Sequence, residues 1–523
     1  MIFINIKFRI KYRSPHSIIH MQKLFSSSLA GISGNLVEVE VDIVTGMGNF
    51  TIVWLGDTAV QESRERVRSA LKNSGFPFPG GARITVNLAP ADLKKKWPIY
   101  DLPIALGILW KEYDFDEAII ASSLFLGELA LDGLVRSIQW ALPATILARE
   151  LGYKYIFLPE ANVPEASVIP DIDVIAVKTL KDVVDMLTGV KLLEKSVKLD
   201  ISTIPRSTMT IDFSSIHGQE QAKRALIISA AWGHNIIMQW PPGSGKTMLA
   251  KALAGILPTM EIEEQIELSK IYSVAGLLTR DIPMITERPF RIIHHTASEA
   301  SIIWWGRDAR PGEISLAHKW VLFLDEFLEF DKSLLETLRQ PLEDGEITIN
   351  RVNMSCRYPC RFSLVWAMNP CPCGYMGDSE KSCTCSPMAI ERYRSRLSGP
   401  ILDRMDIFIQ VPRVKIGELE NKKNQMTTRE IIHIVEVARL TQKERFTGTK
   451  IHRNAEMSNV DIDTFANISE EARKIAISST ERLHLSTRVY YRILRVARTI
   501  ADIALSRSVE VPHILEALSY RWS

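Results

Sequence analysis

A short loop suited to holding phosphate stands near the middle of the chain. Residues 235–239 are a candidate for a short apolar strand, and residues 248–253 have the composition of a helix. The loop between them, WPPGSGKT, ends in Lys246 and Thr247. In this order of elements, backbone N–H groups and the helix N-terminus surround a phosphate, the lysine neutralises its charge and the hydroxyl ligates Mg²⁺. We predict a nucleotide site built from Pro241, Pro242, Gly243, Ser244, Gly245, Lys246, Thr247 and Met248.

Two acidic residues directly follow a second run of apolar residues. Residues 321–324 have the sequence VLFL, which is typical of a buried parallel strand, and Asp325 and Glu326 follow directly. Ligands bind at the carboxyl ends of such strands. We expect Asp325 and Thr247 to hold Mg²⁺, and Glu326 to polarise the attacking water. An acidic pair after a strand is a weak signal by itself, and the phosphate loop upstream strengthens it.

A third strand candidate, residues 363–369, ends in Asn369. The amide of Asn369 is suited to hydrogen-bonding the terminal phosphate or the attacking water, so we predict a catalytic role for it. The alternative is an ordinary asparagine in the turn before Pro370.

Four of the six cysteines cluster directly after Asn369, as Cys371, Cys373, Cys383 and Cys385. Four thiolates can close a tetrahedral Zn²⁺ site, although a one-residue spacer is tighter than usual. A reduced, metal-free loop is the alternative, and the sequence leaves both open. Cys356 and Cys360 are expected in the core or in a hairpin, and the His294-His295 pair is expected to be structural.

The elements that must position these residues belong to a globular protein of several domains. The chain has 523 residues, of which 46% are hydrophobic and 24% charged, and its net charge is +2. At about 150 residues per domain this suggests roughly three domains, and the composition excludes disordered, collagen-like and coiled-coil architectures. The cysteines are too few for a disulfide scaffold. Since no stretch reaches the roughly 18 consecutive apolar residues of a membrane span, we expect a cytoplasmic protein with no membrane partner.

The N-terminal part alternates strand and helix patterns. Residues 36–44 and 83–88 alternate apolar and polar side chains as half-buried strands do, and residues 58–73 have one apolar helical face. Residues 102–110 are a helix candidate. The periodicity is lost over residues 191–209, which we interpret as a linker.

Seven segments carry a pattern that is far more specific than any single motif. They are WPPGSGKTMLAKAL, RPFRIIHHTASEA, RPGEISLAHKWVLFLDEF, LRQPLEDGEITI, AMNPCPCGYMGD, RYRSRLSGPILDRMD and YRILRVARTIADI. Together they resemble the magnesium-chelatase-like AAA+ ATPases, and within them the YifB/ComM branch. The resemblance extends from about residue 24 to the end of the chain.

The resemblance implies an α/β multidomain chain with an AAA+ P-loop NTPase core. It assigns a Lon-protease-like, ribosomal-protein-S5-like α+β domain to residues 21–190, a linker to 191–209, the ATPase core to 210–411 and a helical lid to 412–523. Residues 1–20 precede the resemblance and are interpreted as a mis-start extension. Proteolysis is not expected, because residues 96–103 (KWPIYDLP) take the place of the Lon nucleophile loop and contain no serine.

The resemblance also implies an ATPase that uses ATP and Mg²⁺ and assembles into a homo-oligomeric ring, expected to be a hexamer. Arg404 in LDRMD matches the arginine-finger position, which acts in trans on a neighbouring site. Arg488 matches the second-sensor arginine of the lid. Without the motifs, either arginine would be interpreted as a solvated surface charge.

The resemblance to the ComM branch implies work on DNA, as a helicase or branch-migration motor in the recombination of incoming DNA. Arg351 belongs to a hairpin candidate that would line the pore of the ring. The residues Arg488, Arg492, Arg495 and Arg498 share a helical face, which fits either DNA phosphate binding or a sensor role together with salt bridges between subunits. One alternative function is a chelatase-type motor that remodels a protein partner. The other is an inactive scaffold.

The scaffold alternative depends on an anomaly in the tryptophans. Position 240 is Trp where the resembling family has Gly, and the same holds for Trp54, Trp97, Trp140, Trp232, Trp304, Trp305 and Trp320. The chain has 11 Trp and 27 Gly, about 5% Gly against an average near 7%. Losses that all end in one residue type indicate one cause, and we propose a UGA codon that the source reads as glycine. If Trp240 is genuine, ATP binding is in doubt.

Overall fold

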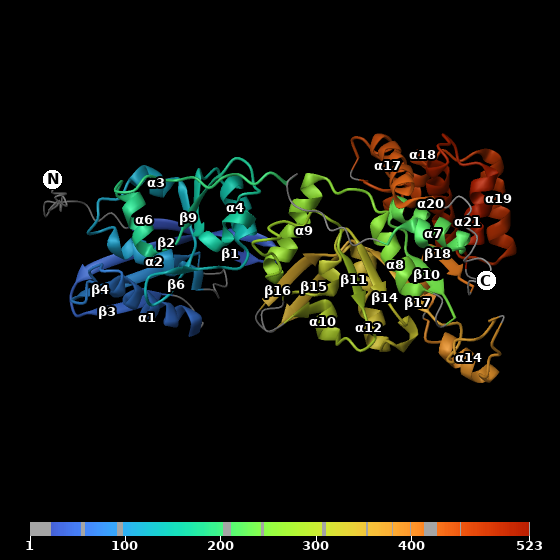
Figure 1. Cartoon of the computed structure of the whole chain (residues 1–523), viewed down its shortest axis with the longest axis horizontal. Helices are drawn as coiled ribbons and strands as arrows, with labels where there is room; N and C mark the ends of the chain where they lie inside the picture. The colour runs from blue at the N-terminus through green and yellow to red at the C-terminus, as the bar shows by residue number, and fades with distance from the viewer. Residues whose placement is uncertain are drawn as a thin grey trace. The chain divides into compact units, whose positions relative to one another are not determined.

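The structure is a computed structural model of the chain (Figure 1). It describes residues 22–53, 58–90, 98–201, 211–241, 245–305, 310–351, 354–378, 380–397, 399–412, 426–449 and 451–521. The chain divides into two compact units, Met1–Pro205 with Gln265–Thr286, and Arg206–Glu264 with Glu287–Ser523. The division after Pro205 falls inside the expected linker. The segment Gln265–Thr286 lies within the range expected for the ATPase core, yet it groups with the N-terminal unit.

The first unit contains a four-stranded sheet of mixed direction. Its strands are β1 (Gln22–Ala30), β2 (Ser33–Thr45), β3 (Asn49–Val53) and β4 (Ala82–Ala89), in the order β1-β2-β4-β3. Only the β3–β4 pair is parallel among these three pairings. Val37, Val39 and Val41 of β2 are buried, as the alternating pattern predicted.

A second, parallel sheet of this unit has the order β5-β8-β9. Its strands are β5 (Ser123–Phe125), β8 (Tyr155–Pro159) and β9 (Asp173–Val177), and β6 (Glu128–Leu129) pairs with β7 (Val135–Arg136). The helices are α1 (Thr58–Asn73), α2 (Asp101–Leu109), α3 (Glu117–Ala121), α4 (Ala141–Glu150), α5 (Val163–Ala166) and α6 (Leu180–Leu187). The predicted helices at 58–73 and 102–110 are therefore confirmed.

The second unit is built on a five-stranded parallel sheet. Its strands are β10 (Ile236–Gln239), β11 (Phe290–Ile293), β14 (Val321–Leu324), β17 (Ser363–Met368) and β18 (Ile407–Gln410), in the order β11-β14-β17-β10-β18. Every residue of β10, β14 and β17 is buried, which explains their continuous apolar runs. All neighbouring pairs are parallel, so the carboxyl ends of the strands share one edge. The predicted α/β class is confirmed.

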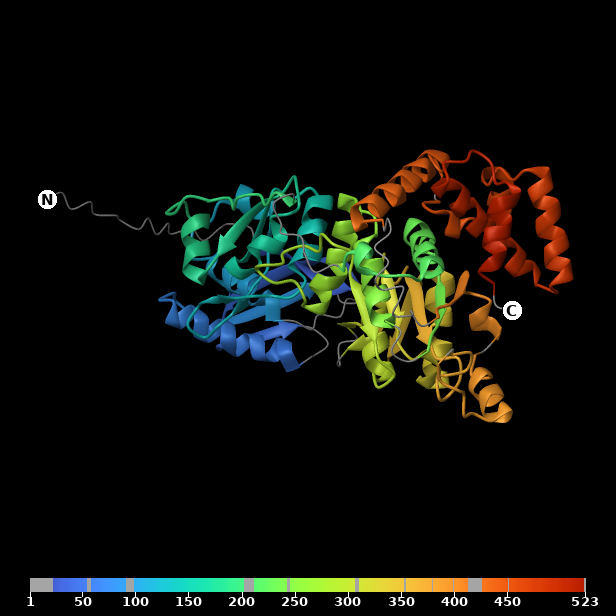
Figure 2. The ribbon, with the colours of Figure 1, turned by 45° about the vertical axis from the view of Figure 1, so that its right-hand side comes forward.

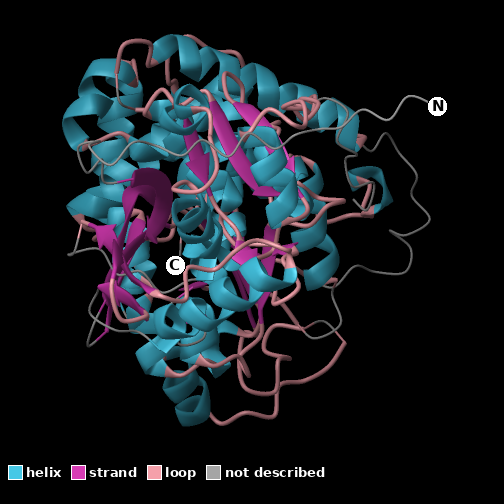
Figure 3. Cartoon of the chain, turned by 90° about the vertical axis from the view of Figure 1, so that its left-hand side faces the viewer, coloured by secondary structure: helices cyan, strands magenta, loops and turns pink. Residues whose placement is uncertain are grey.

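The remaining elements of this core are mostly short. They are α7 (Glu220–Trp232), α8 (Lys246–Gly255), α9 (Ile262–Ala275, shared between the units), α10 (Glu299–Ile303), β12 (Trp304–Trp305), β13 (Arg310–Pro311), α11 (Glu313–Leu316), α12 (Lys332–Thr337), α13 (Arg339–Asp344), α14 (Pro387–Arg394) and α15 (Gly399–Leu402). The expected hairpin is present, with β15 (Glu346–Arg351) antiparallel to β16 (Met354–Pro359). Figure 3 distinguishes the helices, in cyan, from the strands, in magenta.

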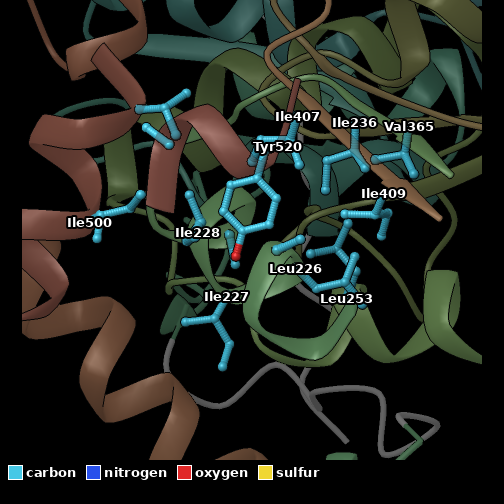
Figure 4. Packing of buried hydrophobic residues seen from close by; sticks show 14 of the residues in the cluster. Leu226, Ile227, Ile228, Ile236, Leu253, Val365, Ile407, Ile409, Ile500 and Tyr520 are labelled. Carbon is cyan, nitrogen blue, oxygen red and sulfur yellow. The ribbon is translucent and has the colours of Figure 1, made fainter. Parts of the chain in front are cut away.

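Five helices close the chain and form one group, coloured orange to red in Figure 2. They are α17 (Thr428–Arg445), α18 (Asn459–Phe465), α19 (Glu470–Arg482), α20 (Thr487–Ile503) and α21 (Val511–Ser519). Their apolar side chains belong to the same core cluster as those of α7, β10 and β18. Tyr520 lies within that cluster beside Ile407 and Ile228 (Figure 4). None of the helices in the described part of the chain is both long and apolar enough to cross a membrane.

The arginines of α20 mostly face the protein. Arg492 donates to Asp406 at 2.7 Å, and Arg498 is fully buried and donates to Asp502 at 2.8 Å. Burial lowers the pKa of Arg495, a third arginine of this helix. The interpretation of this face as a DNA phosphate surface is therefore wrong for Arg492 and Arg498, because their guanidinium groups are used within the chain.

One anomalous tryptophan occupies a glycine-like backbone. Trp140, just before α4, has φ +57° and is 1% exposed. Bulky L-residues are genuine outliers in this left-handed region, whereas glycine enters it freely. The backbone of Trp240 does not share this conformation. Trp54 and Trp97 lie outside the described residues.

Candidate nucleotide site

The phosphate loop follows the central strand β10. Trp240 continues that strand, since its N–H donates to the Met368 carbonyl at 3.0 Å, and its indole is buried in the core cluster. Gly245 has φ +86°, which glycine tolerates, and α8 begins at Lys246. The Lys246 side chain therefore lies at the N-terminus of α8, where phosphate is expected. Pro241 and Met248 flank this turn; Pro242, Gly243, Ser244 and the side chain of Thr247 lie outside the described residues.

Lys246 is the centre of the polar cluster at this edge of the sheet. Its Nζ donates to Asn369 Oδ1, 2.5 Å away, just beyond the end of β17. Burial lowers the pKa of Lys246, while the charges of Asp325 and Glu326 oppose that shift. The lysine, both acids and the asparagine therefore share one site, at the carboxyl ends of three adjacent strands.

Glu326 has a partner that sequence reasoning missed. Its backbone has φ +53°, its N–H donates to Asp325 Oδ1 at 3.0 Å, and its Oε2 lies 3.1 Å from His295 Nδ1. His295 follows β11, which pairs with β14 in parallel, so the two residues meet at the sheet edge. The pair His294-His295 was expected to be structural. The signal that would have found His295 is its place just after a strand adjacent to β14.

The two predicted catalytic arginines meet at one carboxylate. Arg404 is 7% exposed, and its Nη2 donates to Glu343 Oε1. Arg488 of α20 reaches the same oxygen at 3.3 Å. Within one chain, therefore, neither guanidinium is placed against Lys246, and both pair with the single carboxylate of Glu343 in α13.

Asp406 connects the core sheet to the C-terminal helices. Its carboxylate accepts hydrogen bonds from Arg492 and from the Asn235 N–H at 3.1 Å, and His234 Nδ1 lies 3.4 Å away. Burial by itself would raise the pKa of Asp406, but Arg492 and His234 hold it well below its usual range. This carboxylate therefore forms a buried ionic connection between the segments before β18 and β10 and helix α20.

The four clustered cysteines do lie together. Cys371, Cys373, Cys383 and Cys385 place their sulfur atoms within 4.8 Å of one another. Cys356 lies in the β16 strand of the hairpin and Cys360 just after it, and both are buried, as expected. The side chain of Arg351, the predicted pore contact, lies outside the described residues.

Three family models match successive parts of the chain. "Subunit ChlI of Mg-chelatase" matches residues 39–162, "Magnesium chelatase, subunit ChlI" matches residues 212–419 and "Magnesium chelatase, subunit ChlI C-terminal" matches residues 425–521. The central model spans the whole polar cluster around Lys246.

Several known proteins are similar over nearly the full length. Competence protein ComM of Haemophilus influenzae is 41% identical over 508 residues, covering 95% of this chain and 97% of that protein. The uncharacterized protein YifB of Escherichia coli is 37% identical over 505 residues, covering 97% of each. The magnesium-chelatase 38 kDa subunit of Cereibacter sphaeroides is 25% identical over 175 residues, covering 30% of this chain and 52% of the subunit.

Proposed function

Since the chain belongs to the ComM and YifB family of magnesium-chelatase-like proteins, we propose that it hydrolyses ATP at the loop before α8 and uses the energy for work on DNA. The observation that carries the first part is that Lys246 donates to Asn369 and lies within the electrostatic influence of Asp325 and Glu326. An ammonium group, two carboxylates and an amide at one edge of the sheet are suited to binding the triphosphate group of a nucleotide.

Each residue has a role in this proposal. Lys246 and the N–H groups of the loop bind the phosphates. Asp325 offers the carboxylate oxygen that Mg²⁺ prefers, and with Thr247 it would hold the ion, which when bound neutralises phosphate charge. Glu326 takes a proton from the attacking water, and Asn369 orients that water or the terminal phosphate.

The proposed assembly is a ring, expected to be a hexamer, in which a neighbour completes each site. Arg404 would leave Glu343 and reach the adjacent subunit's nucleotide, and Arg488 would turn toward the nucleotide of its own subunit. Support for this comes from the half-exposed carboxylate of Glu343, which both arginines share, and from the exposed position of Arg488, whose surface ion pair breaks at little cost. We also propose the Lon-like, S5-like fold for residues 21–190 and the lid role for residues 412–523.

The DNA part rests on similarity to a protein named for competence and on the hairpin β15–β16. The rival is a motor that remodels a protein, as the similarity to a magnesium-chelatase subunit suggests. That similarity covers only 30% of this chain. A DNA motor is therefore the better-supported function.

A gel-shift assay tests this choice. The purified chain is mixed with branched or single-stranded DNA and a non-hydrolysable ATP analogue, and a Lys246→Ala variant is the control. We expect a nucleotide-dependent shift that the variant does not give. No binding to either DNA by an active ATPase would favour the protein-remodelling motor instead.

A further inference from the structure

We propose that the loop after Asn369 holds one structural Zn²⁺ ion, bound by the sulfur atoms of Cys371, Cys373, Cys383 and Cys385. The ion fastens both ends of the loop and thereby keeps Asn369 beside Lys246. The metal site stands on geometry alone, whereas its effect on catalysis rests on the proposed ATPase function.

The sulfur positions fit a single ion. Cys371 Sγ lies 3.4 Å from Cys373 Sγ and 3.6 Å from Cys383 Sγ, and the latter two sulfurs are also 3.6 Å apart. Zn–S bonds of about 2.3 Å in a tetrahedron place the sulfurs about 3.8 Å apart. A disulfide would need a separation of about 2.05 Å. The observed spacing thus matches a shared metal rather than a covalent pair.

Backbone amides surround the sulfur cluster. The Cys373 N–H donates to Cys385 Sγ at 3.3 Å. The amides of Tyr375 and Thr384 donate to the sulfur of Cys373. Hydrogen bonds of this kind spread the negative charge of four sulfurs around a dication. Because four protein ligands leave no open position, the site is structural rather than catalytic.

The segment that follows the cysteine loop contacts Asn369, the residue from which the loop starts. Cys371 is two residues after Asn369, and Cys385 immediately precedes Ser386, which caps α14. From α14, the buried Tyr393 receives a hydrogen bond from the Asn369 backbone amide. A metal that joins the two ends of the loop therefore holds Asn369 from both sides, through the chain and through Tyr393.

The first experiment measures metal in the purified full-length chain by mass spectrometry. We expect about one zinc per chain in the wild type, and a loss of at least tenfold in a Cys383→Ser variant. Cys356→Ser, which changes a buried cysteine outside the cluster, should keep the zinc. Zinc below a tenth of an equivalent in the wild type, iron in its place, or full retention in Cys383→Ser would overturn the site.

A second measurement does not depend on the folding of a variant. Exchange of the wild-type chain with Co²⁺ should give the intense visible and near-ultraviolet absorption of a tetrahedral sulfur-ligated ion. A weak, octahedral spectrum would contradict the assignment.

The effect on Asn369 is tested with the zinc-stripped chain. We expect hydrolysis of ATP to fall at least tenfold and to return with added Zn²⁺. If hydrolysis is unchanged after the metal is lost, the positioning role is wrong although the metal site stands. If neither metal removal nor Lys246→Ala affects hydrolysis, the proposed function itself fails.

Discussion

At the scale of single residues, Glu326 is held by three features of its surroundings. It combines a left-handed backbone, an amide bonded to Asp325 and a carboxylate bonded to His295. Strained backbone of this kind persists where the surroundings fix it, and such positions concentrate at functional sites. His295 therefore helps to fix the direction of the carboxylate that we propose to act on water.

His295→Ala provides a test of that role. Loss of the orienting partner should lower kcat by roughly tenfold and leave nucleotide affinity nearly unchanged, because Glu326 acts on water rather than on the nucleotide. Steady-state kinetics measure both. The neighbouring exposed His294→Ala should retain wild-type kcat. A rise in kcat in His295→Ala, or equal effects of the two variants, would refute the orienting role.

Position 140 allows the tryptophan anomaly to be tested on the protein itself. The left-handed backbone of Trp140 suits glycine, and the same codon cause was inferred for Trp240. Peptide mass mapping of the protein purified from its natural source should find glycine at both positions. Tryptophan in either peptide would show that the chain carries a genuine indole there and would remove the common cause.

At the scale of elements, local patterns predicted most of what positions the site. The apolar runs of β10, β14 and β17 predicted buried strands because each is covered on both faces. The spacing of the arginines on α20 was less informative. Arg492 pairs with Asp406, which is distant in sequence, and Arg498 pairs with the buried Asp502. A helical pattern shows which residues share a face, but not whether that face contacts solvent or Asp406. The contact of His295 with Glu326 could not be predicted either, because it depends on which strands are neighbours in the sheet.

The contact of Asp406 with Arg492 makes a prediction about stability. Breaking a buried ion pair costs about 3–5 kcal/mol, so Asp406→Asn should strongly lower the free energy of unfolding. Asp463→Asn, at an exposed pair with Arg473, should cost less than about 1 kcal/mol. Urea unfolding measures both variants. Similar losses of unfolding free energy in the two variants would contradict a buried ion pair between Asp406 and Arg492.

The pH dependence of unfolding is expected to follow from the same carboxylate. Its pKa is lower in the folded than in the unfolded state, so its stabilising contribution is present above about pH 4 and is lost as the pH falls below that. Asp406→Asn should flatten the acid side of the stability curve. An unchanged slope in the variant would show that Asp406 is not held ionised.

At the scale of the whole molecule, the sequence similarity identifies the family, whereas the proposed ring would need a residue from a neighbouring subunit to complete each site. Arg404 is bonded to Glu343 within its own chain. If it acts on a neighbour, two inactive variants should repair each other when mixed. A ring formed from Lys246→Ala and Arg404→Ala subunits contains some sites with both residues intact.

Mixing these two variants should therefore restore measurable ATP hydrolysis. A mixture of Lys246→Ala with Glu326→Gln is the control and should stay inactive, because both residues belong to the same subunit's half of the site. Absence of recovery in the first mixture would place Arg404 in its own subunit's site or outside catalysis.

We propose that the cluster of Lys246, Asp325, Glu326 and Asn369 hydrolyses a nucleoside triphosphate. This is tested by Mg²⁺-dependent ATP hydrolysis by the purified chain, with nucleotide binding measured alongside. We expect hydrolysis by the wild type, and binding with turnover about 10²–10⁴-fold lower in Glu326→Gln. Lys246→Ala should lose both binding and hydrolysis. Hydrolysis in Lys246→Ala at the wild-type rate would contradict the claim.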